Sequence, residues 1–224
     1  ENNSELVSED CFVKINLGNK SIDTEKSKNL NLESGTGYFK TSWNKNEICP
    51  EMGKISVKKS NKGTAWGAVY WQYFQDADLV KHHKSPLSVN KKIYLKKYTD
   101  KGPVLQSIND NFTINTGDNI VVRIKIIVDR DMEYVHLKDM RASAFEPVNV
   151  LSGYKYKQGL GYYQNTTDAA TNFFFNYLKK GTYIFEYSLK ATQKGNYSNG
   201  ITTIQCMYAP EFTSHSKGIR IHIK

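Results

Sequence analysis

The sequence has few cysteines and no long apolar run, and both shortages limit what the protein can be. Its three cysteines, Cys11, Cys49 and Cys206, are too few and odd in number for a disulfide scaffold. A bridge between Cys11 and Cys49 is compatible with an oxidising compartment, and the sequence leaves it open. No run of about 18 apolar residues is present, so no membrane-spanning helix is expected. Because the sequence starts at Glu1, without a Met or a signal-peptide pattern, we interpret it as a piece of a longer chain with its targeting signal upstream.

Sequence signatures of catalysis and metal binding are also missing. There is no H-E-x-x-H helix, no paired C-x-x-C, no G-x-S-x-G elbow and no convincing carboxylate pair for glycoside hydrolysis. His82 and His83 are adjacent, and adjacent strand residues face opposite sides, so no metal site is predicted there. The run 129–131 (Asp-Arg-Asp) resembles part of a calcium loop but lacks the distal Glu of an EF-hand, and we interpret it as a strand-end turn. We therefore expect no enzyme activity, metal or cofactor.

Positive charge and aromatic residues are plentiful instead. Lys and Arg number 31 against 22 Asp and Glu, and the formal net charge is +9. The lysines are scattered rather than clustered, which favours a solvated sheet face over a nucleic-acid-binding surface. The 15 tyrosines and 10 phenylalanines favour β-structure.

Short stretches of alternating apolar residues predict an all-β protein. In the clearest one, residues 119–128, five β-branched residues lie on one face while Arg123 and Lys125 lie on the other. No amphipathic helix longer than two turns is evident, and strands at about 10-residue spacing are typical of antiparallel β-sandwiches. We predict two sandwich-like domains, 1–84 and 85–224. The expected strands are 12–17, 38–43, 54–58, 65–74, 87–98, 119–128, 132–137, 173–178, 182–189, 201–205 and 219–223.

The last third of the chain has the densest pattern. Apolar runs at 173–178 and 182–189, separated by a Lys-Lys-Gly turn, predict a β-hairpin. The strand at 201–205 leads into Met207 and Tyr208, which should lie at the strand end near the surface. Pro210 cannot donate to a strand ladder, so the strand is expected to stop there.

Residues 152–168 are rich in glycine and tyrosine and are predicted to form a long loop. Tyrosines with interleaved lysines can stack on sugar rings or bases. They can equally cover the edge of a sandwich core with their hydroxyls in water. The first interpretation makes a carbohydrate-binding sandwich our alternative function. Its ligand loop would use Tyr154, Tyr156, Tyr162 and Tyr163.

Four segments together resemble the C-terminal region of bacterial α2-macroglobulin-like proteins, especially the large Bacteroidetes forms. They are residues 131–142, 145–147, 181–187 and 207–212. Residues 63–71 resemble the strands that complete a CUB-like domain. The part from about Leu87 onwards is similar to the last macroglobulin-like domain, a β-sandwich.

The resemblance implies a non-catalytic module of a periplasmic or cell-surface protease trap. In such proteins a protease cuts a bait region, and a buried thioester is then exposed and captures the protease. The implied partners are the upstream thioester domain of the same parent and, through the parent, the trapped proteases. No nucleic acid is implied, and membrane contact is expected only through a lipid anchor of the parent.

Within that family a Met-Tyr pair covers the thioester, and Met207 and Tyr208 match this pair in type and context. Pro210 and Glu211 match the loop residues that follow it. A polarizable thioether and a broad aromatic ring suit a cover that excludes water. The thioester signature C-x-E-Q is absent, because the run at 49–52 (Cys-Pro-Glu-Met) lacks the Gln, so the thioester must lie upstream of Glu1.

Overall fold

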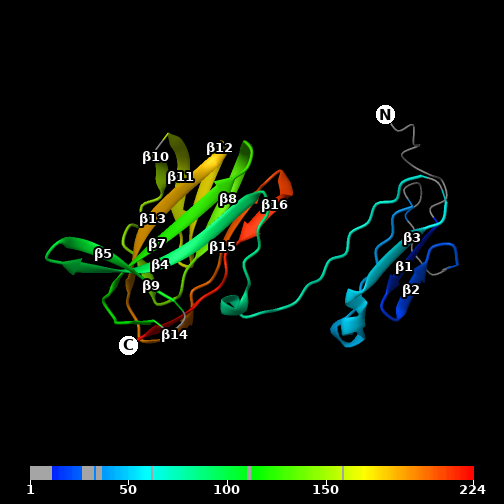
Figure 1. Cartoon of the computed structure of the whole chain (residues 1–224), viewed down its shortest axis with the longest axis horizontal. Helices are drawn as coiled ribbons and strands as arrows, with labels where there is room; N and C mark the ends of the chain where they lie inside the picture. The colour runs from blue at the N-terminus through cyan, green and yellow to red at the C-terminus, as the bar shows by residue number, and fades with distance from the viewer. Residues whose placement is uncertain (1–11, 27–32, 34–36, 62, 110–111, 158) are drawn as a thin grey trace. The chain divides into compact units, whose positions relative to one another are not determined.

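The computed structural model describes residues 12–26, 33, 37–61, 63–109, 112–157 and 159–224, and it confirms the all-β prediction. Strands dominate, and the described residues form only three short 3-10 helices. The chain divides into two compact units, Glu1–Gln72 and Tyr73–Lys224 (Figure 1). The division into a CUB-like part at 1–84 and a macroglobulin-like part at 85–224 stays a prediction.

The first unit contains a three-stranded antiparallel sheet in the order β2-β1-β3. Among the described residues of this unit, the buried apolar side chains are those of Val13, Leu17 and Met52. Gly18 has a φ of +57°, and a Cβ there would lie 2.5 Å from the Glu51 backbone, so only glycine fits this turn. The elements are β1 (Val13–Leu17), β2 (Lys20–Asp23), η1 (Lys45–Glu47), η2 (Pro50–Gly53) and β3 (Ile55–Lys59).

Two predicted strands, at 38–43 and 65–74, are absent. Neither segment pairs with any described strand, and Trp66 and Tyr70 are 86% and 84% exposed. Aromatic residues favour a strand only where a neighbouring strand completes the hydrogen bonds and covers the side chains. No described strand does this for either segment.

The second unit is a β-sandwich made of two larger sheets and one small sheet (Figure 1). The six-stranded sheet has the order β10-β11-β12-β8-β15-β16, and the five-stranded sheet has the order β5-β4-β7-β13-β9. In the small sheet β14-β17-β6, β17 and β6 are parallel. The elements are η3 (Ala77–Leu79), β4 (Leu87–Thr99), β5 (Gly102–Ser107), β6 (Thr113–Ile114), β7 (Asn119–Val128), β8 (Met132–Met140), β9 (Phe145–Pro147), β10 (Gly153–Lys157), β11 (Leu160–Thr166), β12 (Ala170–Leu178), β13 (Gly181–Ala191), β14 (Gly195–Ser198), β15 (Thr202–Cys206), β16 (Ala209–His215) and β17 (Arg220–Ile223).

Strand β7 lies in the middle of the five-stranded sheet, as its strict alternation predicts. Its inward residues are almost completely buried and pack with inward residues of both large sheets. Each face alternates as in a half-buried strand. The inward residues are Ile120, Val122, Ile124, Ile126 and Val128.

The predicted hairpin between β12 and β13 is wrong, because the two strands belong to different sheets. Strand β12 pairs with β11 and β8, whereas β13 pairs with β7 and β9. Phe173 and Phe175 of β12 instead face Phe185 of β13 across the core, with ring centroids 5.5 Å apart in both pairs. The Lys-Lys turn therefore carries the chain from one sheet to the other.

Two smaller expectations also need correction. The predicted loop at 152–168 is the antiparallel hairpin β10–β11. The strand that begins at 201–205 was expected to stop at Pro210. Instead, Pro210 lies within the next strand, β16. This is allowed because β16 is the edge strand of its sheet, where a missing N–H leaves no ladder bond broken.

A strap formed by residues 76–84 lies along β16 and the segment leading to β17. Val80 accepts a hydrogen bond from the Gly218 N–H at 2.9 Å, and Asp78 pairs with Arg220 at 3.3 Å. A Cβ at Gly218 would lie 1.8 Å from the Ala77 carbonyl oxygen, so the close approach requires glycine here.

Candidate functional site

Met207 and Tyr208 form the two-residue turn between β15 and β16. Cys206 and Ala209 pair directly across this turn, after a register shift at Gln205 and Cys206. The Met207 residue is 58% exposed and Tyr208 is 80% exposed, so both side chains project into solvent. Pro210 and Glu211 follow in β16, and both are exposed. The turn thus presents one thioether and one phenol at the tip of a hairpin.

The turn is braced by the start of β8. The Met207 N–H donates to the Tyr134 carbonyl at 2.9 Å, and the Cys206 thiol lies 3.3 Å from the Glu133 carbonyl. The Tyr134 ring meets the Tyr208 ring edge to face, with centroids 5.2 Å apart. Tyr134 has a φ of 52°, a left-handed conformation that is uncommon for a bulky residue and tends to cluster at functional sites. No local pattern in the sequence marks Tyr134 as the partner of this turn.

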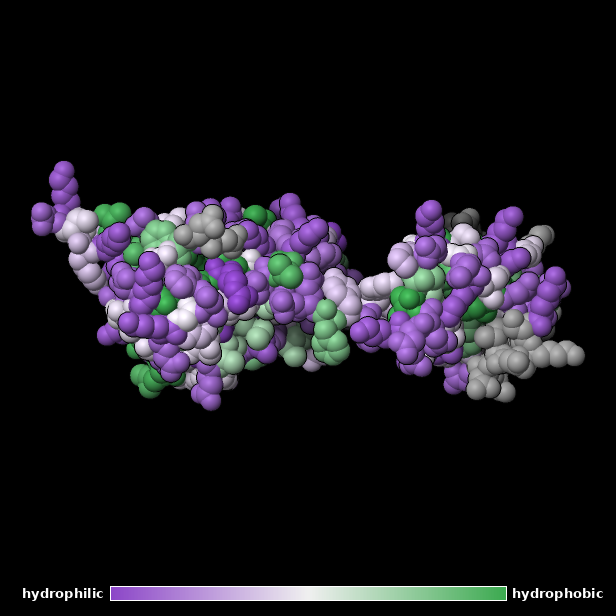
Figure 2. All heavy atoms as spheres, turned by 90° about the horizontal axis from the view of Figure 1, so that it is seen from below, coloured by the Kyte–Doolittle hydropathy of each residue, from purple (hydrophilic) through white to green (hydrophobic). Residues whose placement is uncertain are grey.

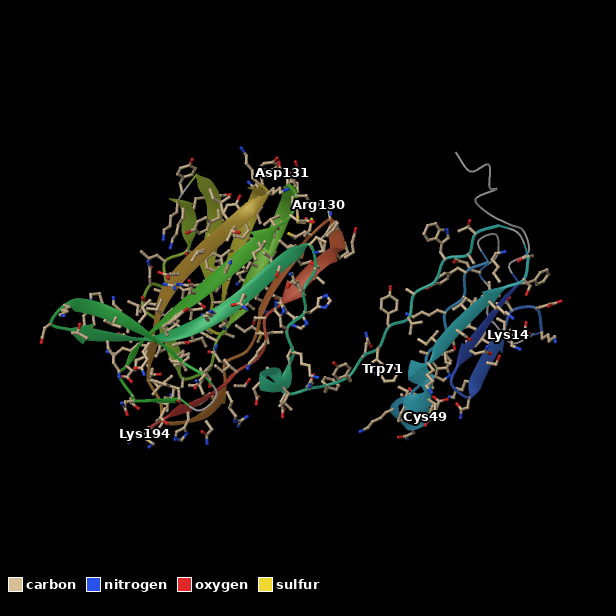
Figure 3. The ribbon with its side chains drawn as sticks, viewed as in Figure 1. Lys14, Cys49, Trp71, Arg130, Asp131 and Lys194 are labelled. Atoms are coloured by element: carbon tan, nitrogen blue, oxygen red, sulfur yellow. The ribbon has the colours of Figure 1, made fainter. Side chains whose placement is uncertain are left out.

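A charged turn links β7 and β8, and its residues Arg130 and Asp131 are labelled in Figure 3. Arg130 binds Asp129 at 3.0 and 3.1 Å and lies over the Phe212 ring of β16 at 5.4 Å. Asp131 accepts hydrogen bonds from the Tyr177 hydroxyl at 2.5 Å and from the Lys180 N–H at 2.7 Å. These donors lower the pKa of the Asp131 carboxyl, so it stays ionised near neutral pH. The residues form a strand-end turn, as predicted.

The outer face of the six-stranded sheet has an aromatic row that crosses four adjacent strands. The row consists of one residue from each of four neighbouring strands, and each residue lies directly opposite the next. These are Tyr154 of β10, Tyr163 of β11, Phe174 of β12 and His136 of β8. Their successive ring centroids are 5.0, 6.4 and 4.6 Å apart. The space-filling view shows hydrophobic residues scattered between hydrophilic ones on the molecule's surface (Figure 2). A row of partly exposed rings on a sheet face can receive a flat or apolar partner.

The four tyrosines proposed as a ligand loop do not share one face. Tyr154 and Tyr156 are 81% and 80% exposed, and Tyr163 is half-buried in the aromatic row. Tyr162 points inward, is 6% exposed and meets Phe185 edge to face at 5.2 Å. Burial raises the pKa of its phenol. Tyr162 is therefore a core residue that no ligand can reach, and Phe174 and His136 are members of the row that the sequence analysis missed.

A buried charge network joins the two large sheets. The Lys91 amine of β4 lies 2.7 Å from the Asp139 carboxylate of β8, and their side chains are only 3% and 0% exposed. The Thr202 hydroxyl donates to the same carboxylate at 2.6 Å, and the Tyr187 hydroxyl donates to its other oxygen. Burial, and then the Asp139 charge, hold the pKa of Tyr187 well above its usual value, so the phenol remains a donor. The Lys91 amine also donates to the Met140 carbonyl at 2.6 Å, so the network is well satisfied and structural in character.

The described residues show neither a ready metal-binding cluster nor a membrane-spanning helix. They contain no cluster of three or more His, Cys, Asp or Glu side chains arranged to hold a metal ion. No helix among them is long and apolar enough to span a bilayer. Cys49 and Cys206 are free thiols, and Cys11 lies outside the described residues.

The family profile of the bacterial alpha-2-macroglobulin MG10 domain matches residues 87–211, from the start of β4 to just beyond the Met207–Tyr208 turn. The chain belongs to this family. This assignment confirms the resemblance to the C-terminal macroglobulin domains of bacterial alpha-2-macroglobulins.

Solved structures agree with the MG10 assignment at the level of fold. Native alpha-2-macroglobulin of Escherichia coli, seen by cryo-EM, is 11% identical with a TM-score of 0.51, and the match covers 96% of this chain and 13% of that one. A crystallised Salmonella alpha-2-macroglobulin mutant is 12% identical with a TM-score of 0.50, over 95% and 13% of the two chains. Among curated proteins, circularly permutated Ras protein 2 of Dictyostelium discoideum is 22% identical over 170 residues, or 76% of this chain and 4% of that protein. The chain thus spans a small fraction of these proteins.

Proposed function

We propose that this MG10 chain is the non-catalytic C-terminal module of a Bacteroidetes-type α2-macroglobulin-like protease trap. In this proposal it packs on the upstream thioester domain of the same parent, and Met207 and Tyr208 shield the thioester. The observation that carries the proposal is the exposed Met207–Tyr208 turn, held against Tyr134 by a backbone hydrogen bond and a ring contact. Large apolar side chains presented to solvent on a braced hairpin favour a partner surface.

The chemistry of a thioester supports a cover of this composition. A thioester persists only where water and amines are excluded, and closing a site with apolar groups does this. The Met207 thioether adapts to an irregular surface, while the Tyr208 ring contributes broad area with little loss of side-chain entropy. Pro210 restricts the backbone after the turn, and Glu211 adds an exposed charge at its rim. In the proposed parent, cleavage of a bait region would remove this cover and let the thioester capture the protease.

The exposed aromatic segment at 65–74 supports membership of a larger parent. Trp66, Tyr70 and Trp71 are 86%, 84% and 55% exposed. Single exposed apolar residues are ordinary, but a contiguous aromatic run of this size favours a covering partner. We propose that upstream strands of the parent complete a CUB-like domain over this run. A periplasmic or cell-surface location, with the signal or lipid anchor upstream, belongs to the same proposal.

Methylamine labelling of the full-length parent, before any protease is added, tests the shielding role. An aromatic residue central to an interface commonly contributes ~2 kcal/mol to the binding free energy. Tyr208→Ala should therefore raise the population of molecules whose thioester is open to solvent about 30-fold. Labelling of the native protein should therefore rise strongly in the variant.

Two controls make this result decisive. Tyr156→Ala removes an equally exposed tyrosine from the opposite edge of the same sheet and should leave labelling unchanged. Denatured wild-type parent should incorporate methylamine, which shows that a thioester is present. If it does so while native wild type and Tyr208→Ala label equally slowly, Tyr208 does not shield the thioester.

The aromatic row keeps carbohydrate binding as a second candidate function. Tyr154 and Tyr156 are strongly exposed, and amide groups such as Asn172, which hydrogen-bonds His136 at 3.0 Å, lie beside the row. Sugars commonly bind through ring stacking and nearby amides, so a Tyr154→Ala, Tyr156→Ala double variant should lose any specific signal on a glycan array. A protein with no glycan signal, or one whose signal survives both changes, would rule out this function for the row.

A further inference from the structure

The strap meets β16 at one residue pair, His83 and His215. Their backbones exchange both hydrogen bonds, His83 N–H to His215 oxygen at 3.0 Å and His215 N–H to His83 oxygen at 3.2 Å. The two histidines are therefore directly opposite each other, a position that places Cβ atoms about 5 Å apart. The Ser214 hydroxyl also donates to the His83 carbonyl, which fixes the strap at this point.

The two imidazole rings lie on the same side of this bridge. Their centroids are 5.5 Å apart and the ring planes differ by 26°. The His215 Nδ1 lies 3.3 Å from the Ser216 carbonyl oxygen. Donation from Nδ1 to this carbonyl leaves the lone pair on Nε2, the arrangement that metal-binding histidines adopt when a backbone carbonyl orients them. The His83 ring is exposed and has no hydrogen bond to another described residue.

A cavity of about 610 Å³ opens beside the pair. His82, His83 and His215 all line it, together with Tyr73 and Gln75. His82 is held by a 3.1 Å contact between its Nε2 and the Val89 carbonyl, so it borders the cavity without joining the pair. The cavity has room for several water molecules next to the two imidazoles.

We propose that His83 and His215 form a binding site for a divalent transition-metal ion of the zinc and copper class. Two imidazole nitrogens serve as ligands, and water from the cavity completes the coordination shell. Imidazole favours zinc, copper and nickel, whereas the absence of a carboxylate from the residues lining this cavity disfavours calcium and magnesium. Two protein ligands and the nearby Lys81 make this a modest site that remains open to exchange.

A metal ion at this pair would hold the strap against β16. Strand β16 directly follows the Met207–Tyr208 turn. A ligand that binds only the folded form stabilises it by mass action. Metal binding should therefore slow hydrogen exchange at the His83 and His215 amides, which form the bridge, before it affects the rest of β16.

Zinc titration of the 224-residue chain, followed by calorimetry and by the NMR signals of the histidine rings, tests the site. We expect zinc to shift the His83 and His215 ring signals, and His83→Ala or His215→Ala to weaken binding at least about tenfold. Since His83 is exposed, its variant should fold normally. His222→Ala removes a histidine that is bonded to Asn196 on the small sheet and is the matched control.

The free thiols of Cys49 and Cys206 are the competing ligands for zinc. If zinc binds with unchanged affinity in both pair variants, or leaves the His83 and His215 ring signals unmoved, the ion is held elsewhere and the site does not exist. Magnesium at the same concentrations should produce no shift, and a magnesium response equal to that of zinc would also overturn the assignment.

Discussion

Replacing Lys91 with methionine is expected to lower the free energy of unfolding of the second compact unit by about 3–5 kcal/mol. Methionine keeps much of the side-chain volume but leaves the Asp139 carboxylate buried, without its cation 2.7 Å away. The Thr202 and Tyr187 hydroxyls would still donate to that carboxylate, and they would not replace the lost charge. Chemical denaturation, with the midpoint and slope fitted together, measures the loss.

Two control variants separate the cost of an unpaired buried charge from the cost of the Lys→Met change itself. Lys92 faces solvent on the same strand, so Lys92→Met should change stability by no more than about 0.5 kcal/mol. Removing both charges, in Lys91→Met with Asp139→Asn, should recover more than half of the loss because no charge is then left unpaired. Equal losses in Lys91→Met and in the double variant would show that packing, and not the buried charge, sets the cost.

Replacing Phe175 with alanine should lower the free energy of unfolding of the second unit by about 3–5 kcal/mol. Phe175 is 1% exposed and packs against Phe185 at 5.5 Å and Tyr162 at 6.0 Å between the two large sheets. Truncation removes a ring from the contact that joins β12 to β13 and leaves a cavity that the rigid sheets cannot close. Thermal and denaturant unfolding of the second unit report the change.

The adjacent phenylalanine provides a matched control. Phe174 faces outward in the aromatic row and stacks on His136 with centroids 4.6 Å apart. Phe174→Ala should cost ~1 kcal/mol, the size of one exposed aromatic pair with partial burial. Similar losses in both variants would mean that the inward and outward faces of β12 have been assigned incorrectly.

Sequence pattern predicted seven strands of the second unit, because alternation is a local property, and it missed the other described strands there. The predicted strands are β4, β7, β8, β12, β13, β15 and β17. Asn119–Val128 was identified from its own residues alone. Sheet membership was predicted incorrectly for β12 and β13. The choice between a hairpin and a crossing to the other sheet depends on which strands distant in the chain offer an edge. The segment 65–74 failed for a related reason, because its strand propensity has no described partner strand.

The candidate sites also depend on contacts between residues that are distant in the chain, and local sequence does not predict such contacts. Met207 and Tyr208 were placed at a strand end from sequence, but their brace, Tyr134, lies more than 70 residues earlier in the chain. The residue Lys91 occupies an inward position in the alternation of Leu87, Val89, Ile93 and Leu95, and that polar interruption was a usable signal of a buried ion pair. No comparable signal links His83 to His215, because their pairing depends on the strap returning to β16.

The order of strands also determines when the sandwich can form. Asp139 and Thr202, partners across β8 and β15, are 63 residues apart, and Thr116 bonds the Lys224 carbonyl 108 residues later. Strand β17, which brings Ile221 and Ile223 into the core, follows all other described strands of the sandwich in the chain. Contacts of such high order make folding slow, in the range of milliseconds to seconds. During translation the unfinished sandwich would therefore leave β14 and β6 without their partner strand, and the core without Ile221 and Ile223, until β17 emerges. A chaperone would have most to protect in that period.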